Sequence, residues 1–136
     1  MDRVDRLNAK IGAFVTVTAD PAMEAARAAE DLVRANRADP AALRLLIGVP
    51  TAIKDWTATA GVRTTYGSEA FASYVPDTDG HVVVALRGAG TISIGKTNTP
   101  EFGLGPYTDN DLVGPPSGSS RHAEGSASLL RAARTA

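Results

Sequence analysis

Lys54 is a candidate for a group that accepts a proton during catalysis. Lys54 closes the apolar run 47–53 and is followed by Asp55 and Trp56. If this run is a strand that ends in the interior, the lysine is drawn out of water, and burial favours the neutral amine that a general base requires. The alternative is an exposed lysine paired with Asp55, because charged side chains usually stay solvated. From the residues alone, both interpretations remain open.

A second lysine lies in a stretch that matches two catalytic patterns. Residues 90–97 fit the phosphate-loop pattern G-x-x-x-x-G-K-[ST], and Ser93 with Lys96 fits S-x-x-K. A phosphate loop needs an irregular turn before a helix, and S-x-x-K needs one helical turn between its members. Residues 91–94 are instead typical of a strand, which directs residues three apart to opposite faces. We therefore predict a paired strand there and no binding of nucleoside triphosphates at Lys96.

Few other groups favour metal, thiol or acid–base chemistry. The chain has no cysteine, and its only histidines are His81 and His122. His122 could serve as a base for Ser120, but no third group orients it, so we expect a solvated loop histidine. Glu101 and Asp109 form a carboxylate pair only if the loop folds back. We predict no metal and no cofactor.

Composition excludes several classes of protein. The 136 residues carry 14 Lys+Arg against 15 Asp+Glu, so bulk charge does not favour a nucleic-acid partner. No stretch reaches the roughly 18 unbroken apolar residues of a membrane span, and the first residues are polar, which predicts a cytoplasmic protein with no membrane partner. Alanine supplies much of the 43% hydrophobic fraction, so we expect a weak core.

The order of the predicted elements favours an α/β fold. Helix signals include a predicted cap and first-turn proline at Asp20-Pro21 and a predicted cap at Asp79. Strand and helix alternate along the chain, which predicts a partial mixed β-sheet flanked by helices. The predicted strands are 13–18, 47–53 and 91–94, and the predicted helices end near residues 11, 37 and 89.

Three blocks in this order and spacing resemble the amidase signature family. They are residues 47–55 (IGVPTAIKD), 61–68 (GVRTTYGS) and 88–103 (GAGTISIGKTNTPEFG). The resemblance runs from about Leu7 to Gly114, whereas a whole family member is several times longer. We therefore expect residues 1–116 to be the N-terminal part of an incomplete amidase-signature domain. Residues 117–136 are expected to be a divergent tail, for which a shifted reading frame is one explanation.

The resemblance implies a catalytic site. Members of the family cleave amides with a triad in which a serine attacks, a middle serine in cis conformation relays the proton, and a lysine is the final base. Lys54 matches that lysine by its motif. Ser126 is the best candidate for the middle serine, although Glu124, Ala127 and Ser128 depart from the family's glycine-rich loop. The nucleophilic serine and the oxyanion hole are expected beyond Ala136, where the chain ends.

These expectations combine into one hypothesis with two rivals. We predict a truncated amidase-family hydrolase whose complete relatives hydrolyse the C–N bond of a small carboxamide through a serine acyl-enzyme, and whose 136 residues alone are inactive and poorly stable. One rival is a non-catalytic remnant or interaction module that self-associates through exposed sheet edges. The other is a phosphate-loop nucleotide binder.

Overall fold

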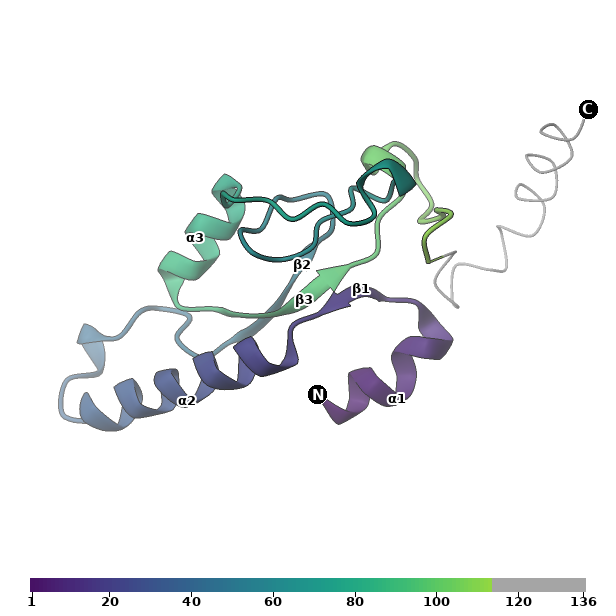
Figure 1. Ribbon diagram of the computed structural model, residues 1–136. Coiled ribbons are helices and arrows are strands. Elements are labelled where there is room, and N and C mark those ends of the chain that lie inside the picture. Colours follow the sequence, from purple (N-terminus) through teal and green to yellow (C-terminus); the bar gives the residue numbers. More distant parts are fainter. Residues whose placement is uncertain (114–136) are drawn as a thin grey trace, which may run out of the picture.

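The computed structural model describes residues 1–113, which form a three-stranded mixed sheet with helices on both sides (Figure 1). The sheet order is β1-β3-β2. This arrangement confirms the predicted α/β class with a mixed sheet. The strands are β1 (Phe14–Val17), β2 (Pro50–Lys54) and β3 (Ile92–Thr97), and the helices are α1 (Asp2–Ile11), α2 (Ala19–Ala35) and α3 (His81–Ala89). Short 3-10 turns lie at Pro40–Ala42, Glu69–Phe71 and Glu101–Gly103.

β3 is the central strand, and it pairs differently with its two neighbours. β1 runs antiparallel to β3, whereas β2 runs parallel to it. Parallel neighbours need a crossover connection, which here includes α3. The carboxyl ends of β2 and β3 therefore lie at the same edge of the sheet, where Lys54 is the register partner of Thr97.

β3 contains an irregularity that changes which residues share a face. From Thr51 to Ile53, β2 advances two residues, while β3 advances three residues between their partners Ser93 and Lys96. The extra residue falls at the glycine Gly95, whose φ is +150°. A bulge of this kind redirects the side chains that follow it. Lys96 is consequently a partner of Ile53 and lies on the face opposite Ile92.

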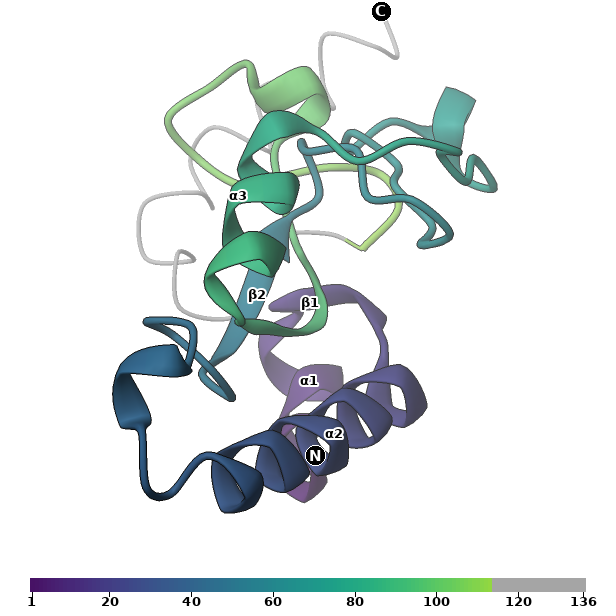
Figure 2. The same cartoon turned by 90° about the vertical axis from the view of Figure 1, so that its left-hand side faces the viewer.

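α2 packs its small side chains against the sheet. Ala22 and Ala29 are buried and cluster with Ile92. These two alanines lie on the same face of the helix, which explains why an alanine-rich helix can approach the strand closely. Figure 2 shows α2 beneath the sheet, with α3 on the other side. Partly buried Ala26, Ile47 and Ile94 complete this small core.

Two predicted helix caps are wrong. Asp20 lies inside the first turn of α2, and the helix is preceded by Thr18, which makes no side-chain capping bond. Asp79 does not cap α3, because Gly80 occupies that position. Instead, Asp79 accepts a hydrogen bond from the backbone N–H of Ala60 and pairs with Arg87. Its carboxylate thus ties the long loop after β2 to α3.

The second strand also differs from its prediction. Residues 47 and 48 belong to a turn and Val49 precedes the strand, since Gly48 has a φ of +79° and its N–H bonds to the carbonyl of Gly90. Strand pairing begins at Pro50 and ends at Lys54, immediately after the apolar run. Within residues 1–113, no helix is both long and apolar enough to cross a bilayer.

Candidate active site

Lys54 is the last residue of β2, and its side chain is exposed. Of the two interpretations of Lys54, the one in which burial draws the lysine out of water is therefore wrong for the part of the chain that is described. The reason lies in the strand alternation: Ile53 takes the buried side of β2, and no described element covers the opposite side at Lys54. No hydrogen bond or ion pair to the Lys54 ammonium forms within residues 1–113.

Asp55 does not pair with Lys54 either. Its carboxylate is completely buried and faces the opposite way, with Oδ1 at 3.7 Å from the Lys96 ammonium. Oδ2 accepts hydrogen bonds from the backbone N–H of Thr65, at 3.0 Å, and from the Thr65 hydroxyl. The alternative interpretation correctly predicted that Lys54 is exposed, but its predicted Lys54–Asp55 ion pair is wrong, because Asp55 lies against Lys96 instead.

Asp55 also fixes the backbone that follows Lys54. Its N–H donates to the carbonyl of Thr97 at 2.9 Å, and its carbonyl accepts from the N–H of Tyr66 at 3.1 Å. One residue back, the carbonyl of Lys54 accepts from the N–H of Thr57 at 2.9 Å. The main chain of Lys54 is therefore held on both sides, while its side chain is left facing solvent.

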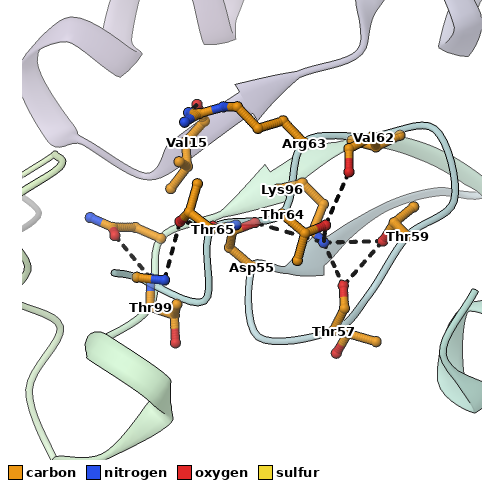
Figure 3. A network of polar contacts seen from close by, with 12 residues as sticks. Val15, Asp55, Thr57, Thr59, Val62, Arg63, Thr64, Thr65, Lys96 and Thr99 are labelled. Atoms are coloured by element: carbon orange, nitrogen blue, oxygen red, sulfur yellow. Dashed lines mark hydrogen bonds and ion pairs between the residues drawn. The ribbon is translucent and has the colours of Figure 1, made fainter. Parts of the chain in front are cut away.

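Lys96 is the largest side chain that is completely buried among the described residues. Figure 3 shows its ammonium between two arms of the loop that follows β2. It donates to the carbonyl of Thr57, to the hydroxyl of Thr59 at 3.1 Å and to the hydroxyl of Thr64 at 2.8 Å. Burial lowers the pKa of Lys96 to about 8, against the opposing pull of Asp55 and Asp79.

The burial of Lys96 tests the two sequence patterns that contain it, the phosphate loop and S-x-x-K. The predicted paired strand at 91–94 is confirmed from Ile92 onward, and the Lys96 amine is directed into threonine oxygens rather than into an open loop. One step of the reasoning against S-x-x-K is wrong: because of the bulge at Gly95, Ser93 and Lys96 lie on the same face. They are nevertheless not bonded to each other, since the lysine donates to the three threonines.

A second anchor connects the same loop to β1. The Arg63 guanidinium donates to the carbonyl of Val15 at 3.0 Å and to that of Ala72 at 2.7 Å (Figure 3). Further along, the side-chain amide of Asn110 donates to Asn98 Oδ1 and to the carbonyl of Thr99. Polar contacts therefore link the loops at this edge of the sheet.

Aromatic rings cover the outside of these loops. The Tyr66 ring lies edge-on to Phe71 at 5.3 Å and is stacked with Tyr74 at 6.2 Å. Tyr66 and Phe102 both have positive φ, at 54° and 50°, and the N–H of Phe102 bonds to the carbonyl of Tyr66 at 2.7 Å. Burial, followed by Tyr74 and Asp55, raises the pKa of Tyr66.

The remaining predicted site residues divide into two groups. Ser126, Ser120 and His122 lie outside the described residues. Glu101, Asp109 and His81 are exposed. Within residues 1–113, no group of three or more His, Cys, Asp or Glu side chains is close enough to hold a metal ion.

The sequence prediction did not anticipate the buried cluster around Lys96. Four threonines between Asp55 and Tyr66 were its signal in the sequence: Thr57, Thr59, Thr64 and Thr65. Hydroxyl groups at such density in one loop can satisfy a buried charge. Their meaning depends on Lys96, which the fold brings from a distant part of the chain.

Comparison with known proteins places these features in one family. A family model described as Amidase matches residues 1–127. The chain belongs to the amidase family. Among its relatives is a glutamyl-tRNA(Gln) amidotransferase subunit of Aromatoleum aromaticum, 46% identical over 115 residues, which cover 85% of this chain and 22% of the relative. The corresponding protein of Geobacter sulfurreducens is 38% identical over 112 residues, covering 82% and 22%. The chain thus spans about a fifth of the length of these curated relatives.

Solved structures of amidase-family enzymes resemble the fold. A bacterial aryl acylamidase of the amidase signature family matches with a TM-score of 0.72 at 28% identity, over 85% of this chain and 24% of that enzyme. A glutamyl-tRNA(Gln) amidotransferase subunit from Thermotoga maritima matches with a TM-score of 0.63 at 26% identity, covering 85% and 22%. The relatives are therefore enzymes of amide chemistry, and the matched family segment includes the position of Lys54.

Proposed function

We propose that this chain supplies the lysine-bearing part of an amidase active site, with Lys54 as the final base and Ser126 as the proton-relaying serine. One observation carries the proposal. Lys54 ends a strand at the edge where the carboxyl ends of β2 and β3 meet, with its main chain fixed and its amine unengaged by residues 1–113. Ligand sites in open α/β sheets favour this edge.

The proposed reaction is hydrolysis of a small carboxamide. A neutral Lys54 amine accepts the proton of the Ser126 hydroxyl, which takes the proton of a nucleophilic serine as that serine attacks the amide carbon. The proton then returns to the leaving nitrogen as the C–N bond breaks, and water hydrolyses the acyl-serine. The nucleophile and any cover over the exposed Lys54 would come from polypeptide outside residues 1–113.

A chimera tests the role of Lys54. Residues 1–113 replace the superposed segment of the bacterial aryl acylamidase, and release of the aromatic amine from an aryl acylamide is measured. We expect Lys54→Met to lower kcat by about a hundredfold or more, the usual size of a general-base contribution. Arg3→Met, at an exposed position in α1, is the matched control and should retain the rate.

Two further variants keep the test decisive. If the chimera does not fold, the acylamidase itself is substituted by Met at the residue that superposes on Lys54. Its rate then shows whether the residue at this position of the sheet is needed for catalysis. A longer chimera with residues 1–127 isolates Ser126: activity that survives Ser126→Ala refutes the relay role alone. A folded chimera in which Lys54→Met keeps the full rate refutes the proposed base.

A further inference from the structure

The Lys96 ammonium holds together two arms of one loop. It contacts Thr57 and Thr59 on the outgoing arm, and Thr64 on the returning arm. Asp55, at the start of the loop, lies 3.7 Å from the same nitrogen. A buried ammonium is costly unless its donors are satisfied, so the conformation of the loop and the position of this charge depend on each other.

The same loop begins at the proposed base. The carbonyl of Lys54 accepts from the N–H of Thr57, whose own carbonyl accepts from Lys96. Asp55, the next residue, is tied to Thr65 by two hydrogen bonds. Each contact that fixes the main chain after Lys54 is thus within one residue of a group that faces the Lys96 ammonium.

Lys96 and Lys54 are on opposite faces of the sheet. The extra residue in β3 makes Lys96 a partner of Ile53, whereas Lys54 is a partner of Thr97. Lys96 therefore cannot contact a substrate that approaches the Lys54 amine on the face of the sheet to which Lys54 belongs. Any influence of Lys96 on Lys54 must pass through the loop.

We propose that Lys96 is a positioning residue for Lys54, acting by closing the loop of residues 55–66 around its buried ammonium. This inference rests on the proposed function of Lys54. It assigns to the GKT stretch of the third motif block a role different from phosphate binding. The amine is required for its N–H donors, because a side chain of similar length without donors would leave three buried loop oxygens unpaired.

Amide hydrogen exchange in the 136-residue chain tests the loop directly. In Lys96→Met, we expect the N–H groups of Thr57, Thr65 and Tyr66 to exchange at least about tenfold faster, while those of α2 change by less than about twofold. Lys54→Met is the matched control, since it removes an exposed lysine from the same region, and it should change neither set. Equal acceleration in the loop and in α2 means a global stabilising role and refutes the proposal, as does no acceleration.

Kinetics in the acylamidase chimera supply a readout that a purely structural role would not move. Lys96→Met should lower kcat by at least about tenfold while KM stays within about twofold, since Lys96 has no access to substrate. Lys96→Arg, which retains N–H donors at this position, should recover part of kcat. A folded Lys96→Met chimera with unchanged kcat refutes positioning. If Lys54→Met is fully active, the proposed function fails, and hydrogen exchange still decides whether Lys96 organises the loop.

Discussion

Burial of the Lys96 ammonium should make the protein more stable as the pH rises above 7. The pKa of Lys96 is about 8 in the folded chain, against an ordinary value of 10.5. Below pH 8 both states hold the proton, and the folded state keeps its charge at the cost of burial. Between pH 8 and 10.5 the unfolded chain binds more protons, so the free energy of unfolding increases with pH.

The size of this effect follows from the two pKa values. A full shift from 10.5 to about 8 corresponds to roughly 3 kcal/mol. Between about pH 7 and about pH 9.5 the expected gain is about 2 kcal/mol, because most of the titration of the folded state lies in that interval. The negative charges of Asp55 and Asp79 favour the ammonium and oppose the shift. Stopping at about pH 9.5 avoids ionisation of Tyr66, whose pKa is raised.

Urea unfolding across this pH range measures the effect. Trp56, the only tryptophan, packs against Gly103 and reports on the loop edge by its fluorescence. Lys96→Met should remove the rise with pH, and Lys54→Met, at an exposed lysine, should retain it. Sucrose at constant concentration provides a folded baseline if the chain is weakly stable. A wild-type stability that is flat or falling with pH, or a rise that persists in Lys96→Met, would refute the reasoning.

Three other outcomes are expected. Gly95→Ala should destabilise the chain by on the order of 2 kcal/mol or more, since the new Cβ would lie 2.3 Å from the Thr16 carbonyl oxygen and Gly95 has a φ of +150°. The control is Gly88→Ala in α3, where the new Cβ meets nothing within 4 Å and stability in the same melt should be unchanged or increased. ATP and GTP should show no saturable binding in calorimetry, and binding that Lys96→Ala abolishes would restore the phosphate-loop interpretation. The 136-residue chain alone should not be labelled by a fluorophosphonate and should melt at low temperature or self-associate through the edges of β1 and β2; a labelled serine in a cooperatively melting monomer contradicts both expectations.

The sequence was a reliable guide where local chemistry decides the structure. The β-branched and aromatic residues of β1 have the strand conformation that their types favour. The charged residue that closes the apolar run 47–53 is indeed the last residue of β2. The three blocks predicted the family because they occur in a fixed order, and each block contains glycine and at least one charged residue.

Prediction from the sequence failed where the pairing of distant segments determines which way a side chain points and which partner it meets. The bulge at Gly95 exists only in relation to β2, so alternation along β3 placed Ser93 and Lys96 on opposite faces when they share one. Asp55 pairs with Lys96 rather than with its sequence neighbour because the fold brings a buried cation to it. The exposure of Lys54 depends on which elements cover β2, and no local pattern in the sequence encodes that cover.

The central claim is that Lys54 is the base of an amidase site. The most direct measurement is the rate at which a fluorophosphonate phosphonylates the nucleophilic serine of the folded acylamidase chimera that carries residues 1–113, with loss of fluoride, compared with its Lys54→Met variant at neutral pH. We predict that the variant reacts about a hundredfold more slowly, because the serine loses the final acceptor of its proton. Equal rates in two chimeras with the same melting temperature would contradict the account.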